Sequence, residues 1–149
     1  MDEQILMMPG HLINRAARHL QRIGEEKFQP LGLGIAQMPV LAALRDGRSL
    51  SQMDLARLAN VEQPTMAQLL ARMERDGLIR RTPNPEDRRA SFVTLTRKAQ
   101  ARLPQAREIL LEGNRIAVEG LSRKEVATLC SLLGRVNANL DAYRRQHNE

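Results

Sequence analysis

The stretch from Ser51 to Arg81 reads SQMDLARLANVEQPTMAQLLARMERDGLIRR, and it holds two short helical patterns on either side of a tight turn. Residues 51–54 form a predicted capping box, in which a serine oxygen accepts an early backbone N–H and a carboxylate reaches back. The turn falls at residues 59–61, and a second helix is predicted over about residues 62–75. Gly77 suits the left-handed position that ends such a helix. The sequence therefore predicts a helix-turn-helix in the middle of the chain.

The second of these helices has one apolar and one polar side. Its apolar stripe recurs at helical spacing and consists of Met66, Leu69, Leu70 and Met73. The polar side chains that we expect to be exposed include Gln63, Thr65, Gln68 and Arg72. A helix of this length fits the major groove of duplex DNA. There glutamine can bond an adenine edge, threonine can contact a phosphate or a thymine methyl group, and arginine can contact a phosphate or a guanine. These four side chains are candidate DNA-binding residues.

A predicted β-hairpin follows the helix-turn-helix. Residues 78–82 and 91–95 are rich in strand-forming side chains, and the polar loop at residues 83–90 joins them. This order of elements predicts a winged helix-turn-helix, with the hairpin as the wing.

The basic residues of the chain are concentrated around this hairpin. The whole chain has 23 Lys and Arg against 17 Asp and Glu, which gives a formal net charge of +6. Between Arg80 and Lys98 there are six basic and two acidic residues, which gives +4. Arginine at a hairpin tip can enter a narrow A·T-rich minor groove, so Arg88 and Arg89 are further candidate DNA-binding residues. Asp87 could pair with the guanidinium group of Arg89 and aim it. The alternative interpretation is a solvated loop.

Helical patterns flank the helix-turn-helix on both sides. We expect helices over residues 9–29 and about 36–46, and two more within residues 97–147. Pro104 should kink the first helix of that last pair, and Ser122 begins the second with another capping box. The wide apolar stripe of the last helix is either packed within the monomer or used for dimerisation.

These patterns together predict one domain over residues 1–149, mainly α with a small β-hairpin wing. Residues 36–96 would form the DNA-binding lobe, and residues 9–29 and 97–147 would form the dimerisation helices.

Composition excludes several other classes of protein. No apolar run reaches the roughly 18 residues that a membrane helix needs. The first residues, MDEQILMMPGH, lack the pattern of a signal peptide, so we expect a cytoplasmic protein. Aromatic residues make up only 2% of the chain, which argues against binding single-stranded nucleic acid by stacking. The single cysteine, Cys130, cannot form an internal disulfide. We expect a buried, inert thiol; a redox sensor or an intersubunit disulfide is the alternative.

The chain resembles the MarR family of multiple antibiotic resistance regulators from Gly10 to about Tyr143. The matching stretches are GHLINRAARHL, LGLGIAQMPVLAAL and LARLANVEQPTMAQLLARMERDGLIRR. The most specific is DRRASFVTLT at Asp87–Thr96, which fits the wing pattern D-x-R followed by L-T. The EQPT of the recognition helix is similar to the SlyA branch of the family.

The resemblance implies a homodimer with interlocked N- and C-terminal helices that binds a pseudo-palindromic operator, most often as a repressor. It implies that Arg89 is the minor-groove arginine, with Asp87 as its orienting partner. Thr65 and Gln68 fall on DNA-facing positions of the recognition helix. Gln68 departs from the SlyA branch, where an arginine is expected, so the operator sequence of that branch is not carried over to this chain.

The resemblance also implies a small aromatic or phenolic effector bound between the dimer helices and the winged lobe. His11, Arg15 and Met38 are the candidate lining residues. No residue pattern indicates a metal site, a cofactor or a catalytic set, so we do not expect an enzyme. A winged-helix module that binds another protein, and not DNA, is the alternative function.

Overall fold

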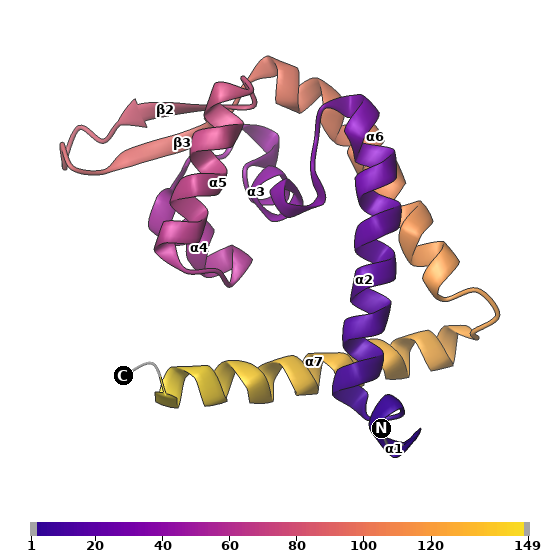
Figure 1. Cartoon of the computed structure of the whole chain (residues 1–149). Helices are drawn as coiled ribbons and strands as arrows, with labels where there is room; N and C mark the ends of the chain where they lie inside the picture. Colours follow the sequence, from indigo (N-terminus) through magenta and orange to yellow (C-terminus); the bar gives the residue numbers. More distant parts are fainter. Residues whose placement is uncertain (1–2, 148–149) are drawn as a thin grey trace. The chain divides into compact units, whose positions relative to one another are not determined.

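The computed structural model describes residues 3–147, which divide into two compact units (Figure 1). The first unit extends to Gly113 and the second begins at Asn114. This boundary falls inside a helix and does not coincide with the predicted end of the lobe at residue 96. The elements of the first unit are α1 (Glu3–Leu6), α2 (Pro9–Phe28), η1 (Gln29–Leu31), η2 (Ile35–Gln37), α3 (Met38–Ala43), η3 (Arg45–Gly47), β1 (Leu50–Ser51), α4 (Gln52–Ala59), α5 (Gln63–Arg75), β2 (Ile79–Pro83), β3 (Ser91–Leu95) and most of α6 (Arg97–Ala117). The second unit contains the end of α6 and all of α7 (Arg123–His147).

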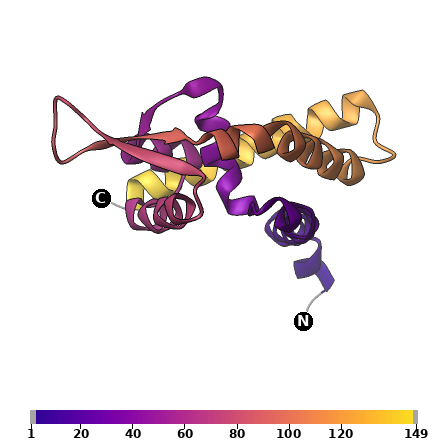
Figure 2. The same ribbon diagram turned by 90° about the horizontal axis from the view of Figure 1, so that it is seen from above.

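The winged helix-turn-helix predicted from the sequence is confirmed. Helices α4 and α5 are followed by the hairpin β2–β3, which we call the wing (Figure 1). The wing strands pair antiparallel, from Ile79 opposite Leu95 to Pro83 opposite Ser91. Viewed from above, the wing projects away from α3, α4 and α5, so its tip is far from the core (Figure 2).

A single apolar core holds the lobe together. Its largest fully buried side chains come from α2, α3, α4, α5 and both wing strands, and include Phe28, Leu41, Leu44, Leu55, Met66, Leu70, Met73 and Val93. Burying a side chain of this size contributes about 1.5–3 kcal/mol. The recognition helix α5 and the base of the wing are therefore fixed to the same core.

The third strand of the sheet, β1, was not predicted. Leu50 pairs with Val93 and Ser51 with Phe92, so β1 covers the outer edge of β3. Two residues are too few to show the alternating pattern by which strands are recognised in a sequence.

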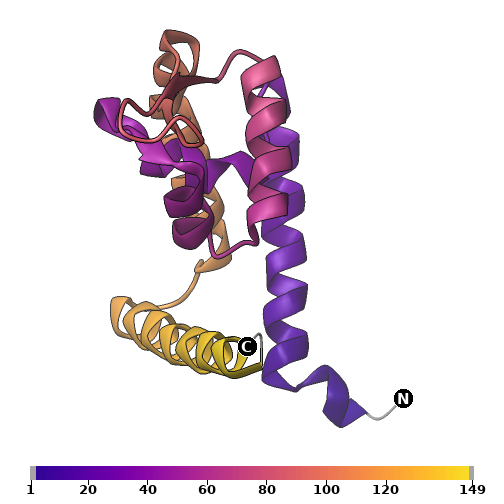
Figure 3. The same cartoon turned by 90° about the vertical axis from the view of Figure 1, so that its left-hand side faces the viewer.

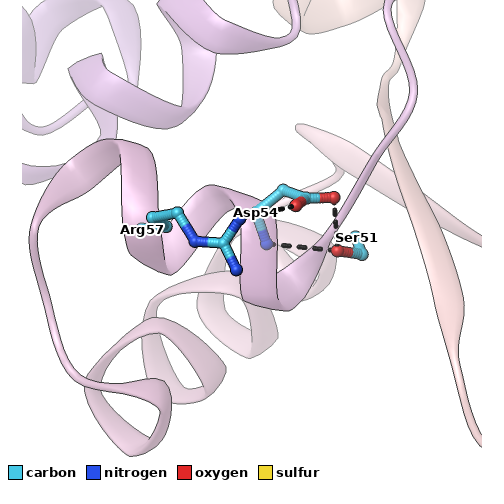
Figure 4. A network of polar contacts seen from close by, with 3 residues as sticks. All are labelled: Ser51, Asp54 and Arg57. Atoms are coloured by element: carbon cyan, nitrogen blue, oxygen red, sulfur yellow. Dashed lines mark hydrogen bonds and ion pairs between the residues drawn. The ribbon is translucent and has the colours of Figure 1, made fainter.

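The cap of α4 differs in one bond from the predicted box (Figure 4). Ser51 Oγ accepts the backbone N–H of Asp54 at 3.1 Å, as expected. The Asp54 carboxylate, however, accepts a 2.7 Å bond from the hydroxyl group of Ser51. Arg57 lies 3.9 Å from the other carboxylate oxygen. The cap thus fixes the start of α4 through side chains.

The predicted helix over residues 36–46 is wrong in its extent. The segment begins with the short turn η2, in which the Gln37 side chain accepts the N–H of Gly34 at 3.0 Å. Helix α3 occupies only Met38–Ala43, with Pro39 in its first turn. Asp46 then has a left-handed backbone, with φ of 61°, which a continuing helix cannot accommodate.

Helix α2 confirms the helix predicted over residues 9–29. Its two buried residues, Gly24 and Phe28, both lie near its C-terminal end. The N-terminal half extends beyond the helices of the lobe (Figure 3). A 2.6 Å ion pair between Lys27 and Glu112 joins α2 to α6. Helix α6 itself continues through Pro104.

The second unit is built on α7, whose predicted capping box is confirmed. Ser122 donates its backbone N–H to the Glu125 carboxylate at 2.8 Å, and Ser122 Oγ accepts the N–H of Glu125 at 3.2 Å. Helix α7 buries no residue in the single chain. Cys130 is accordingly exposed, which corrects the expectation of a buried thiol. Within the described residues, no helix is long and apolar enough to cross a bilayer.

Candidate nucleic-acid interface

The recognition helix α5 presents one polar face to solvent. Thr65, Gln68 and Arg72 are all exposed, and their spacing of three and four residues puts them on one side of the helix. Met66, Leu70 and Met73 occupy the opposite side and are fully buried. We call Thr65, Gln68 and Arg72 the reading face, because their donors and acceptors are available to a groove.

Gln63 does not share this face. It is exposed, but it lies two residues before Thr65 and therefore points to another side of the helix. Its side-chain oxygen accepts a 3.2 Å bond from Gln52, the first residue of α4. The structure thus separates Gln63 from the other three residues predicted with it.

Two local features set the ends of α5. Asn60 ends α4 with a left-handed backbone, φ 53° and ψ 46°, which makes the tight turn between the helices. Gly77 has φ of 71° directly after the C-cap of α5, and its N–H bonds to the Glu74 carbonyl oxygen at 3.0 Å. Leu78 N–H then returns to the Met73 carbonyl oxygen at 2.8 Å, which closes the helix and starts the wing.

The wing tip, residues 84–90, is organised by two side-chain turns. Asn84 Oδ1 accepts the N–H of Glu86, and Asp87 Oδ1 accepts the N–H of Arg89, both at 2.9 Å. The sequence predicted an ion pair between Asp87 and the guanidinium group of Arg89. Within residues 3–147, the two side chains do not form it. Asp87 fixes the backbone of Arg89 instead, because a carboxylate two residues earlier readily closes such a turn. Arg88 and Arg89 are both exposed.

The six basic side chains between Arg80 and Lys98 have two kinds of role. Arg81 pairs with Glu74 at 3.2 Å, and Lys98 Nζ donates to the backbone carbonyl oxygen of Asp76 at 2.8 Å. Both hold the lobe together. The remaining four are exposed and form no ion pair within the described residues: Arg80, Arg88, Arg89 and Arg97. The cationic surface of the wing is therefore smaller than the charge count indicated.

The predicted effector residues are not brought together. Arg15 lies with Arg18, His19 and Arg22 in an open hollow of about 380 Å³ on α2, whose lining includes neither His11 nor Met38. His11 is half-buried one turn before Arg15. Met38 packs in the core of the lobe with 8% of its surface exposed. Among the described residues, no group of three or more His, Cys, Asp or Glu side chains is placed to hold a metal ion.

Comparison with known proteins places this geometry among transcriptional regulators. Residues 31–90 match the model of the MarR family. The chain is 34% identical over 90 residues to the uncharacterised HTH-type transcriptional regulator YwoH of Bacillus subtilis, covering 60% of this chain and 65% of that protein, just under two thirds of its length. It is 29% identical over 128 residues to the multiple antibiotic resistance protein MarR of Escherichia coli, covering 85% of this chain and 89% of MarR.

Solved structures agree over most of the chain. A mutant of E. coli MarR in complex with operator DNA has a TM-score of 0.81 at 28% identity, covering 91% of this chain and 99% of MarR. BpsR of Bordetella bronchiseptica, in a structure concerned with the regulation of its DNA binding by 6-hydroxynicotinic acid, has a TM-score of 0.80 at 26% identity. The aligned part covers 89% of this chain and 94% of BpsR.

Proposed function

We propose that this chain is a MarR-type transcriptional regulator, a homodimer that binds a pseudo-palindromic operator in duplex DNA and represses transcription; the match of residues 31–90 to the MarR family model and the likeness to MarR support this. It is a regulator and not an enzyme. In each protomer, α5 would enter a major groove and the wing tip would enter the adjacent minor groove. The relatives named above are bacterial, so the proposed place of action is the cytoplasm, where the DNA lies.

The observation that carries this proposal is the division of α5 into a buried and a polar side. Met66, Leu70 and Met73 fix the helix in the core, while Thr65 and Gln68 are exposed on its other side. A helix held in this way costs little further conformational entropy when it enters a groove. The exposed arginines of the wing supply the positive charge that a phosphate backbone attracts.

The operator complex of MarR supports the same mode of binding, because the match extends over nearly the whole of that chain. In this mode the two recognition helices of the dimer reach half-sites about one helical turn apart, with centres separated by roughly 10 base pairs. Arg88 and Arg89 would contact the minor groove beside each half-site.

We further propose that a small hydrophobic or phenolic effector releases the protein from DNA. The regulation of BpsR by 6-hydroxynicotinic acid supports an aromatic acid. The arginines around Arg15 would suit its carboxylate group, with His11 as a neighbouring contact. Met38 is in the core and would reach an effector only if α3 moved. Such a ligand would favour a dimer whose helix spacing no longer matches the operator.

DNA binding is tested by fluorescence anisotropy with a labelled random-sequence duplex at rising salt. A protein that makes six to ten phosphate contacts loses about 10³–10⁵-fold in affinity between 50 and 200 mM salt. We expect binding at low salt and a steep loss of this order. No binding at low salt would contradict the proposal and would favour a winged-helix module that binds a protein.

The effector is tested by adding 6-hydroxynicotinic acid to the preformed complex. We expect release by the wild-type protein and a weaker response from the Arg15→Gln variant. If saturating acid leaves the wild-type complex unchanged, aromatic acids of this kind are not its effectors.

A further inference from the structure

Arg81 connects three elements of the DNA-binding lobe. It lies in β2 opposite Val93, and 27% of its side chain is exposed. Its Nε atom donates to Glu74 Oε2 at 3.2 Å, near the C-terminal end of α5. Its Nη1 atom lies 3.5 Å from Oε1 of Gln52, the first residue of α4. One guanidinium group therefore joins the wing strand to both helices of the helix-turn-helix.

The connection continues from Gln52 to the other end of α5. Gln52 Nε2 donates to Gln63 Oε1 at 3.2 Å. Arginine can only donate hydrogen bonds, so Gln52 must turn its oxygen toward Arg81, which leaves its amide nitrogen for Gln63. We call Glu74, Arg81, Gln52 and Gln63 the polar clamp. The polar clamp contacts α5 near both of its ends, and Arg81 connects these contacts to the wing.

None of the clamp contacts is part of the reading face. Gln63 points to a different side of α5 from Thr65, Gln68 and Arg72, and its oxygen is already bonded within the lobe. Arg81 is half-buried, whereas its neighbour Arg80 is exposed on the opposite side of the strand. The clamp is therefore suited to supporting the residues that meet DNA, and not to reading bases itself.

We propose that Arg81, Gln52 and Gln63 are positioning residues that couple the wing to the recognition helix, an inference that rests on the proposed DNA-binding function. Once α5 is bound in the major groove, the wing tip is held close to the adjacent minor groove. Its effective concentration near that groove is therefore high. A clamp that fixes the wing relative to α5 raises that concentration. Breaking the clamp should therefore reduce the contribution of Arg89 to DNA affinity, although Arg89 is not one of the clamp residues.

A double-mutant cycle on the full-length protein tests this coupling. The probe is the duplex that the wild-type protein enriches from a random-sequence library, and the variants are Arg81→Met, Arg89→Ala and the two combined. In the wild-type background we expect Arg89→Ala to weaken binding tenfold or more, as for the loss of a direct arginine contact to DNA. In the Arg81→Met background we expect that cost to be at least about threefold smaller, as for coupled residues.

Two further variants separate coupling from charge. Arg80→Met removes the same charge from the adjacent residue of the same strand, and its effect should add to that of Arg89→Ala. Gln52→Met breaks the clamp without any change of charge, and it should reduce the cost of Arg89→Ala as Arg81→Met does. If the effect of Arg81→Met adds to that of Arg89→Ala in the same way as the effect of Arg80→Met does, Arg81 contributes only its charge and the coupling is refuted.

Hydrogen exchange in the free protein gives a readout that does not depend on DNA. In Arg81→Met we expect faster exchange of the backbone amides at both the start of α5 and the wing strands, with the core of α5 unchanged. Unchanged exchange in both segments, or an equal rise throughout the protein, would overturn the inference. A wild-type protein that enriches no duplex would refute the proposed function, and the exchange result would still decide whether the clamp couples the two elements.

Discussion

At the scale of single residues, Arg89 has a fixed backbone and an exposed side chain. Its N–H is held by Asp87 at 2.9 Å, while its guanidinium group forms no ion pair within residues 3–147. A side chain prepared in this way can enter a minor groove without first breaking a contact in the protein.

Replacing Arg89 with alanine should weaken operator binding by about 1–3 kcal/mol and leave the dimer intact. Gel-shift titration measures the affinity, and light scattering measures the dimer. Arg107→Ala, which removes an exposed arginine of α6, is the matched control and should have little effect. Equal affinities for wild type and Arg89→Ala would remove the wing from the mechanism.

The sequence predicted which residues could meet DNA better than it predicted how they are held. Thr65, Gln68 and Arg72 follow from helical spacing, which is local. The bonds of Arg81 depend on a strand, a helix end and a helix start that are up to 29 residues apart, so no local pattern reveals them. Asp87 illustrates the same limit, because its residue type allowed either a guanidinium pair or a backbone turn.

At the scale of elements, α5 depends on its buried side for its position. Leu70 is fully buried, whereas Leu58, on α4, is 65% exposed. Removing three carbons from a buried leucine loses the transfer free energy and leaves a cavity.

Leu70→Ala should therefore lower the free energy of unfolding by about 2–5 kcal/mol. The matched substitution Leu58→Ala should change it by less than about 0.5 kcal/mol, as for other surface sites. Chemical denaturation followed by circular dichroism compares the two. Similar losses for both variants would show that the core is not centred on α5.

The cap of α7 should make stability depend on pH. The backbone N–H of Ser122, with a smaller effect of its side chain, lowers the pKa of Glu125 below its ordinary value. A lowered pKa in the folded state means that the cap contributes fully above the unfolded pKa and is lost as the pH falls through the folded value.

The difference in Tm between wild type and Glu125→Gln should therefore be largest near neutral pH and should shrink in the acid range. Thermal unfolding at a series of pH values measures it. A difference that stays constant down to the most acid pH would contradict this role of Glu125.

Helices with strong apolar periodicity were predicted well, as α2, α5 and α7 illustrate. The segment before β1 was not, because Pro39 and the left-handed Asp46 break a pattern that apolar spacing alone suggested. Strand β1 is stabilised by pairing with β3, and its two residues carry no signal of their own.

At the scale of the whole molecule, much of the apolar side of α7 stays exposed to solvent within the described residues. Leu129, Leu132 and Leu140 are 40%, 50% and 57% exposed. Apolar surface of this kind marks an interface, which agrees with the proposed homodimer. The sequence predicted the apolar stripe of α7 but left open whether the stripe packs within the monomer or forms a dimer interface. Membership in the SlyA branch likewise stays a prediction.

Leu132→Glu combined with Leu140→Glu should convert the dimer to monomers, because the interface would have to bury charges. Sedimentation velocity measures the state of association. Ser131→Glu with Asn139→Glu adds the same charge at exposed polar positions of α7 and should leave the dimer unchanged. If the leucine variant remains dimeric at the same concentration, the interface lies elsewhere.

In the proposed complex, the two recognition helices of one dimer read two half-sites of duplex DNA. Selection of bound sequences by the full-length protein from a random duplex library tests it most directly. We predict a pseudo-palindrome with half-site centres roughly 10 base pairs apart, flanked by A·T pairs where the wings lie. Enrichment of a single unpaired half-site, or of no sequence at all, would contradict the account.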